Sequence, residues 1–456
     1  MNKDQLKRFV SNLLSLVIIF VLTYLYSLIW SLCYAKTIPD PFWNKGNWLV
    51  IAIYAIVAYA FMKIYGSKNI GDWRIIDIIY SQCLSVVFLN LFTYLLISLI
   101  NRWFANFWPL IWLTVFDFIC VFCWTVIAKY LYRKIYPPRE VLLIYGDRDP
   151  DDLINKMNTR KDKYNLCEFI SVSVGIDIVK NRMKQYSSVI ICDLPADLRN
   201  DMVKFCYRES IRAYVTPKLS DIILFGADNS NIFDSPLLIC KNRGIRIERR
   251  IIKRIMDLLV IIPVAVLTLP FNLIFATLIK LYDGGNVFYK QERLTVGGKI
   301  FFIYKFRSMK MNSEQGVAQL AKKNDGRITP IGKFLRKTHL DELPQIINIL
   351  RGEMSVVGPR PERPEIAAEY KKLIPEFDFR LHTKAGLTGY AQVFGKYNTS
   401  PYDKLKLDLY YIEHQSTLLD IELILKTLRI LVTRDNTEGV SADQTTAMKN
   451  KNDGDK

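Results

Sequence analysis

Four apolar runs, each long enough to cross a lipid bilayer as a helix, occupy most of the first 137 residues of this 456-residue chain. They cover residues 9–35, 48–65, 77–103 and 107–132. A transmembrane helix needs about 20 apolar residues, so each run has the required length. The first run is too long for the core of a signal peptide, and no small-residue cleavage site follows it. The sequence therefore predicts an integral membrane protein with a four-helix bundle over residues 1–137.

Basic residues near the ends of these runs predict the orientation of the bundle, because lysine and arginine are enriched in cytoplasmic loops. They lie before the first run, between the second and third runs, and after the fourth: Lys3, Lys7, Arg8, Lys63, Lys68, Arg74, Lys129, Arg133, Lys134 and Arg139. The other two loops carry only Lys36, Lys45 and Arg102. Both ends of the bundle are therefore expected on the cytoplasmic side, together with everything after Pro137.

The formal net charge of +18 points to an anionic partner. In a chain with membrane-length runs, this charge favours membrane lipid and phosphorylated substrates over nucleic acid. Cysteine chemistry is excluded from the carboxy-terminal half, because no cysteine follows Cys240.

A middle segment, residues 138–246, has α/β character. Short apolar runs at residues 141–145, 188–192 and 213–216 are typical of buried parallel strands, with polar helix-like stretches between them. The turn at residues 146–150 stands where a dinucleotide-binding fold keeps its glycine-rich loop. It has one glycine, and Asp147 and Asp149 would repel a pyrophosphate. We expect a Rossmann-like domain that does not bind a dinucleotide.

A fifth apolar stretch at residues 255–279 contains Asp257, Pro263 and Pro270 and has basic residues at both ends. A straight span would place one basic cluster on the outer side, against the usual charge bias. Proline kinks helices, so a helix bent at Pro270 that enters and leaves by one face is the preferred interpretation. An ordinary fifth span is the alternative. Residues 247–440, which include this stretch, are predicted to form a third domain rich in helices. The polar residues 441–456 are predicted to be disordered.

Two adjacent carboxylates, Asp341 and Glu342, precede an apolar helical stretch. Proline is tolerated in the first turn of a helix, so Pro344 indicates that the helix starts close to these carboxylates. The positive end of a helix favours anions, and an ionised carboxylate there can act as a nucleophile or a metal ligand. Simple helix capping is the alternative. Nearby, Lys305 and Arg307 alternate with aromatic residues on a predicted strand, and Arg336 and Arg360 flank the carboxylates. Such a basic set could bind phosphate oxygens.

Five ordered motifs within this third domain carry a family resemblance. They are FYKQER at residues 288–293, YKFRSM at 304–309, LDELPQ at 340–345, RGEMSVVGPRPERP at 351–364 and GLTGYAQV at 386–393. This order and spacing resemble the bacterial sugar transferases, the polyprenyl-phosphate hexose-1-phosphate transferases. The bundle and the nucleotide-fold-like domain resemble the long members of that family.

The resemblance implies transfer of a sugar-1-phosphate from a UDP-sugar to undecaprenyl phosphate, with release of UMP and a requirement for Mg²⁺. Asp341 would attack the β-phosphate and carry a covalent phosphosugar, and Asp341 with Glu342 would hold the metal. Phosphate-binding roles fall to Lys305, Arg307, Arg336 and Arg360, and Pro270 matches the break of a re-entrant helix. Motif-supporting roles fall to Glu292, Arg293, Pro359, Gly386 and Gln392.

The resemblance also implies a place in exopolysaccharide, capsule or O-antigen synthesis at the cytoplasmic face of a bacterial inner membrane. A homo-oligomer and partners in polysaccharide assembly are left open, as are the sugar and the polymer. The chain departs from the family at Leu269-Pro270, where a serine usually precedes the proline, and at Ala385 and Tyr390. A non-catalytic scaffold of polysaccharide assembly is the alternative function. A transporter is disfavoured because few charges are expected inside the bundle.

Overall fold

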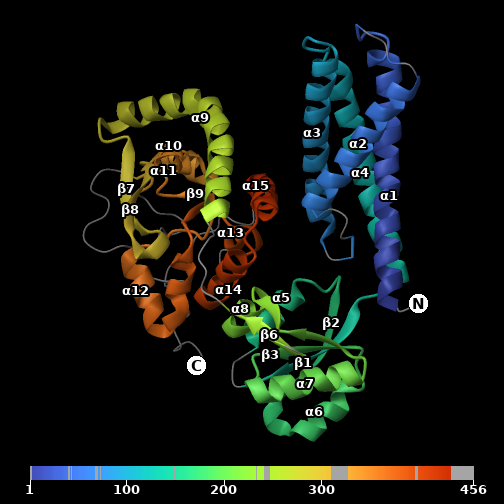
Figure 1. Cartoon of the computed structure of the whole chain (residues 1–456), viewed down its shortest axis with the longest axis vertical. Coiled ribbons are helices and arrows are strands. Elements are labelled where there is room, and N and C mark those ends of the chain that lie inside the picture. Colours follow the sequence, from blue (N-terminus) through green and yellow to red (C-terminus); the bar gives the residue numbers. More distant parts are fainter. Residues whose placement is uncertain are drawn as a thin grey trace. The chain divides into compact units, whose positions relative to one another are not determined.

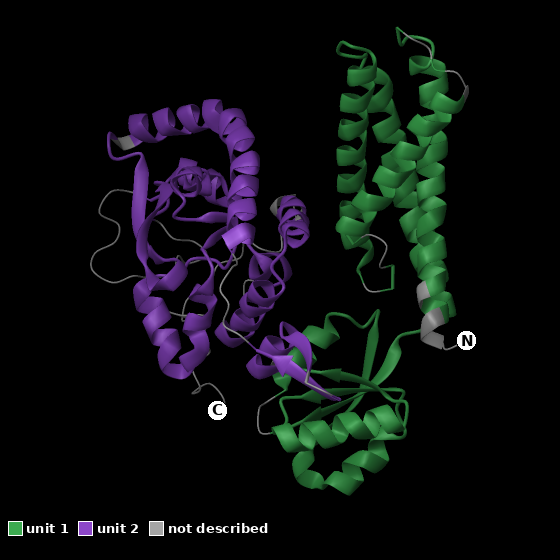
Figure 2. Ribbon diagram, viewed as in Figure 1, with its two compact units in different colours: residues 1–217 green, residues 218–456 purple. Residues whose placement is uncertain are grey.

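A computed structural model of the chain divides into two compact units, residues 1–217 and 218–456 (Figure 2). The structure describes residues 3–39, 42, 44–66, 70–71, 73–146, 150–232, 234–240, 247–309, 327–395 and 399–432. The predicted tail at residues 441–456 and the aspartates Asp147 and Asp149 lie outside the described residues. The boundary between the units falls within the predicted middle domain, and the predicted three-domain division stays a prediction.

The first unit begins with the predicted four-helix bundle (Figure 1). Its helices are α1 (Lys3–Ile29), α2 (Asn44–Ile64), α3 (Ile75–Ile100) and α4 (Trp108–Ile135), with a π-helical turn, Trp30–Tyr34, continuing α1. Each is long and apolar enough to cross a membrane. Large apolar side chains are exposed on the outside of the bundle, Phe20 and Leu99 among them. Exposed apolar surface of this extent is expected of a membrane-embedded bundle.

Two charged side chains of the bundle are buried among the described residues. Asp117 and Lys129, both on α4, are almost fully buried, which agrees with the expectation of few internal charges. The Lys129 ammonium donates hydrogen bonds to the carbonyl oxygens of Ile70, at 2.9 Å, and Trp73, at 2.8 Å. These bonds tie α4 to the segment between α2 and α3.

The rest of the first unit is a parallel sheet with helices between its strands. In chain order the elements are β1 (Arg139–Tyr145), α5 (Asp151–Asn158), β2 (Tyr164–Ser171), α6 (Ile176–Met183), β3 (Ser188–Cys192), α7 (Ala196–Arg208) and β4 (Arg212–Val215). The strand order is β2-β1-β3-β4. The three strands expected from apolar runs are confirmed. β2 was missed because its sequence, YNLCEFIS, alternates polar and apolar residues at an edge of the sheet.

The second unit is rich in helices, as expected. It opens with α8 (Leu219–Phe225) and the hairpin of β5 (Asp228–Ile232) and β6 (Ser235–Ile239), which precede α9 (Ile247–Asp283). A hairpin of β7 (Phe288–Leu294) and β8 (Ile300–Phe306) follows. The later elements are α10 (Pro330–Lys337), α11 (Gln345–Arg351), β9 (Ser355–Val357), α12 (Pro364–Leu373), β10 (Gly386–Thr388), α13 (Tyr390–Phe394), α14 (Pro401–Glu413) and α15 (Thr417–Val432).

Helix α9 changes direction along its length (Figure 1) and contains Pro263 and Pro270. It extends beyond the predicted 255–279 at both ends. Its amino-terminal half is attached to the unit through Asp257, whose Oδ1 accepts hydrogen bonds from the Ser355 hydroxyl and the Val356 amide, both at 2.9 Å. Its carboxy-terminal half packs through Ile279 on a small apolar cluster. Both halves therefore contact the same unit, while most of the helix surface is apolar and exposed.

Candidate functional site

The two adjacent carboxylates lie on a short helical turn, Leu340–Glu342, immediately before α11. α11 begins at Gln345 with Pro344 as its amino-terminal flanking residue, so this helix starts slightly later than predicted and the carboxylates lie on a separate turn before it. The residues that flank the turn and α11 on the amino-terminal side, His339 and Pro344, make no side-chain capping hydrogen bond. His339, just before the turn, has a φ of 56°, which an L-residue adopts at a cost. The chain thus bends sharply at His339 to present the pair.

Glu342 is held by two cations. Its Oε1 accepts hydrogen bonds from the Lys305 ammonium of β8, at 2.7 Å, and from the Arg360 guanidinium, at 3.0 Å. Burial alone would raise the pKa of Glu342, but the charges of Lys305 and Arg360 outweigh it and hold this pKa well below the ordinary value. Glu342 is therefore ionised at neutral pH and fixes two basic side chains beside Asp341.

Asp341 differs from its neighbour. No hydrogen bond or ion pair engages its carboxylate among the residues that the structure describes, although the side chain is only partly exposed. Burial raises the pKa of Asp341 and the adjacent Glu342 charge adds to the rise, while Lys305 and Arg336 oppose it. A partly desolvated carboxylate with an available oxygen and raised basicity is suited to nucleophilic attack.

Of the remaining predicted cations, Arg336 is close enough to Asp341 for its charge to act on that carboxylate. Arg336, on α10, donates a 2.7 Å hydrogen bond from Nε to the Ser308 hydroxyl. Arg307 directly follows β8, and its backbone amide donates to the Val287 carbonyl at 3.0 Å. Lys305 and Arg360 are the two that contact the carboxylate pair directly. Phosphate binding by this set stays a prediction.

Three of the motif-supporting residues, Arg293, Pro359 and Gly386, belong to or contact the turn that carries Arg360. The Gly386 amide donates to the Pro359 carbonyl at 2.9 Å, and a Cβ on Gly386 would lie 2.1 Å from the Gly358 nitrogen. Arg293 donates to the Pro361 carbonyl at 3.0 Å. Any side chain at residue 386 would therefore separate the turn from β10. Glu292 is exposed on β7.

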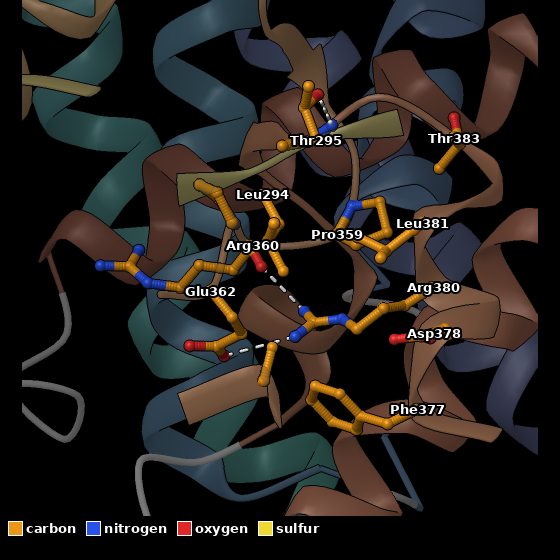
Figure 3. A pocket seen from close by; sticks show the side chains of 13 residues that line it. Leu294, Thr295, Pro359, Arg360, Glu362, Phe377, Asp378, Arg380, Leu381 and Thr383 are labelled. Atoms are coloured by element: carbon orange, nitrogen blue, oxygen red, sulfur yellow. Dashed lines mark hydrogen bonds and ion pairs between the residues drawn. The ribbon is translucent and has the colours of Figure 1, made fainter. Parts of the chain in front are cut away.

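A buried ion network behind this turn was not foreseen (Figure 3). The Arg380 guanidinium lies between the Glu362 carboxylate, 3.4 Å away, and the Arg360 carbonyl, and it also pairs with Asp408 at 2.8 Å. Lys404 also pairs with Glu362. Burial would raise the pKa of Glu362, but Lys404 and Arg380 lower it to about 2. Glu362 belongs to the motif at residues 351–364, but no motif includes Arg380 or Asp408, and their pair joins positions far apart in the sequence.

Gln392 contributes a further buried polar group. Neither its amide nitrogen nor its amide oxygen has a hydrogen-bond partner among the described residues. A Cβ on Gly389 would meet both the Gly358 carbonyl oxygen, at 2.1 Å, and the Gln392 Oε1, at 2.7 Å. The carboxamide thus lies beside the residue that precedes Pro359 and Arg360. Buried amides without partners are rare, so this one is a candidate for contact with a ligand.

The fit of a metal rests on the carboxylate pair alone. The described residues contain no group of three or more histidine, cysteine, aspartate or glutamate side chains that could hold a metal ion. Mg²⁺ commonly takes one or two protein carboxylates and completes its shell with water and substrate phosphates. Asp341 and the second oxygen of Glu342 match that smaller donor set.

Comparison with known proteins places this geometry in context. A family model described as "Bacterial sugar transferase" matches residues 248–434. An "Uncharacterized sugar transferase" from Haemophilus influenzae is 31% identical over 68% of this chain and 72% of its own length. A "UDP-N-acetylgalactosamine-undecaprenyl-phosphate N-acetylgalactosaminephosphotransferase" from Aeromonas hydrophila is 42% identical over 40% of this chain.

A "UDP-glucose:undecaprenyl-phosphate glucose-1-phosphate transferase" from Xanthomonas campestris pv. campestris is 36% identical over 49% of this chain. The matches to the Aeromonas and Xanthomonas proteins span 44% and 48% of those relatives' lengths. The likeness to named enzymes is therefore a likeness of part of each chain.

Proposed function

This chain belongs to the bacterial sugar transferase family, and from that premise we propose that it transfers a sugar-1-phosphate from a UDP-sugar to undecaprenyl phosphate, releasing UMP. The Aeromonas and Xanthomonas relatives are both named for undecaprenyl phosphate, one with an N-acetylgalactosamine donor and the other with a glucose donor. The observation that carries the proposal is the contrast within the carboxylate pair: Glu342 is bound by two cations, while Asp341 has an available carboxylate.

In the first step, an Asp341 carboxylate oxygen attacks the β-phosphorus of the UDP-sugar. The bond from that phosphorus to the bridging oxygen breaks, and UMP leaves with the electron pair. The product on the protein is an aspartyl phosphosugar. Lys305 and Arg360, both paired with Glu342, would offset the charge on the diphosphate.

In the second step, a phosphate oxygen of undecaprenyl phosphate attacks the same phosphorus. The bond between Asp341 and phosphorus breaks, which restores the carboxylate and yields the lipid-linked diphosphate sugar. Mg²⁺ bound at Asp341 and Glu342 would neutralise phosphate charge and favour departure of UMP. Two successive displacements predict ping-pong kinetics.

We further propose that α9 is a re-entrant helix whose two ends face the cytoplasm. Its bend, its interior prolines and the attachment of both halves to the second unit support this. A lipid acceptor has its phosphate at headgroup level, and a site held at that level meets both the lipid and a cytosolic nucleotide. We also propose that the protein lies in a bacterial inner membrane and that the transfer initiates the synthesis of a polysaccharide repeat unit. The sheet of the first unit would be a Rossmann-like module without dinucleotide.

The test is UMP release by the full chain in lipid nanodiscs containing undecaprenyl phosphate, with UDP-glucose, UDP-galactose and UDP-N-acetylgalactosamine compared. Release that depends on the lipid acceptor and one donor is expected. Labelled donor alone should leave a phosphosugar on Asp341. If no donor yields UMP while the protein remains folded, the scaffold alternative takes its place.

A further inference from the structure

An acidic side chain lies inside the membrane bundle without a cationic partner. Asp117, in the middle of α4, is completely buried. One of its oxygens, Oδ2, accepts a 3.1 Å hydrogen bond from the Asn90 amide of α3. The other oxygen, Oδ1, is buried and has no hydrogen-bond partner among the described residues. No lysine, arginine or histidine of the described chain forms an ion pair with this carboxylate.

The surroundings of Asp117 supply further oxygen atoms from three helices. Asn90 donates its second amide hydrogen to the Thr114 hydroxyl at 2.9 Å, and its carbonyl oxygen accepts from the Tyr54 hydroxyl of α2 at 3.2 Å. The Tyr26 ring of α1 stacks on the Tyr54 ring with centroids 4.1 Å apart. All four helices thus contribute to one polar cluster, defined here as Asp117, Asn90, Thr114, Tyr54 and Tyr26.

An unpaired carboxylate is unstable in an apolar membrane interior, and one neutral amide does not balance its charge. Ionisable groups inside transmembrane bundles commonly bind ions or protons for this reason. The other titratable groups facing Asp117 are Tyr54 from α2, with Tyr26 stacked upon it from α1, and Cys120 on α4 itself. From α3, the residue that hydrogen-bonds Asp117 is the uncharged Asn90. None of these groups carries a positive charge.

We propose that Asp117 binds a small monovalent cation, a proton or a sodium ion, at the centre of the four-helix bundle. A proton would reside on Oδ1. A sodium ion would be bound by Oδ1 together with neighbouring hydroxyl or amide oxygens of the cluster. This site is separate from the proposed transferase site and does not depend on that activity.

Thermal unfolding of the full chain in detergent, followed with probes in the first unit, tests the proposal. In one series, sodium replaces choline at constant ionic strength and constant pH. In a second series, the pH is varied with choline as the only added cation. A sodium site predicts a sodium-dependent rise of the midpoint, by roughly 2–4 °C near saturation. A proton site predicts no sodium effect and a midpoint that falls as pH rises through the pKa of the bound state.

Asp117→Asn, which keeps the shape and removes the charge, should abolish either response. Asp201→Asn, on the surface of the α/β region, is the matched control and should respond as the native chain does. Tyr54→Phe and Thr114→Val keep the carboxylate and should weaken a sodium response if Asp117→Asn does not fold. An infrared carboxylic acid band lost in Asp117→Asn would identify the proton. A native chain that responds to neither cation, with no such band, overturns the proposal.

Discussion

The guanidinium of Arg380 donates a hydrogen bond of 2.8 Å to the backbone carbonyl oxygen of Arg360. The two arginines therefore act in series: Arg380, buried and paired with Asp408, fixes the backbone from which Arg360 reaches Glu342. A proline on each side of Arg360 limits its backbone further. The position of the Arg360 guanidinium therefore depends on Arg380, a buried residue that has no described interaction with Asp341 or Glu342.

Substitution of Arg380 should reduce turnover through Arg360. Arg380→Met leaves Asp408 and Glu362 without their buried cation, and breaking a buried pair costs about 3–5 kcal/mol. The double variant Arg380→Met/Asp408→Leu removes one stranded charge and should recover part of the stability but little of the turnover. Thermal unfolding and UMP release measure the two effects. Native turnover in a stable double variant would exclude a positioning role.

Asp341→Asn should lower UMP release by at least roughly 10³-fold, because the amide is a far weaker nucleophile than the carboxylate. It should also prevent labelling of the protein by a phosphate-labelled donor. Asp378→Asn, at the surface, serves as the control and should keep both signals. Full activity in a folded Asp341→Asn protein would dismiss the covalent mechanism.

Glu342 should stabilise the fold in a pH-dependent manner. Its pKa is depressed in the folded state, so its contribution is present above the ordinary value of 4.5 and is lost as pH falls toward the folded pKa. Glu342→Gln should therefore lower the free energy of unfolding by about 1–3 kcal/mol at neutral pH, because Lys305 is left unpaired. The difference from the native chain should shrink below pH 4.5. Unfolding midpoints across this range measure it, and a constant difference would contradict the ion-pair account.

Gln392→Leu should separate binding from stability. Removing a buried amide without partners should leave the unfolding midpoint unchanged or slightly higher. If the amide contacts the donor, KM for the UDP-sugar should rise about tenfold, which corresponds to one lost hydrogen bond of ordinary strength. Gln185→Leu, an exposed position, is the control. A lower midpoint with unchanged KM would show that Gln392 is structural.

The two ends of α9 should be accessible from the same side of the membrane. Single cysteines at Glu248 and Leu281, both exposed, can be introduced into a chain without its eight native cysteines. An impermeant maleimide should label both in inverted vesicles and neither in right-side-out cells. Labelling of one end from each side would establish a fifth crossing, in agreement with the alternative topology.

The sequence predicted well those features that depend on neighbours in the chain. The apolar runs located every long helix, and Pro344 indicated the approximate start of α11. Glu342, Lys305 and Arg360 were each predicted as site residues. The bonds between them were not predicted, because the three residues come from three separate segments. The Arg380–Asp408 pair and the burial of Asp117 were missed for the same reason. Each depends on packing between distant segments, which a local pattern does not record.

The outer surface of α9 has a practical consequence for dissecting this chain. Leu267 and Leu281 are 71% and 78% exposed, and most of the helix resembles them. Deleting residues 1–217 would therefore not yield a freely soluble fragment, because the apolar surface of α9 would still need a detergent or lipid to cover it. Preparation of the second unit by itself should begin from solubilised membranes.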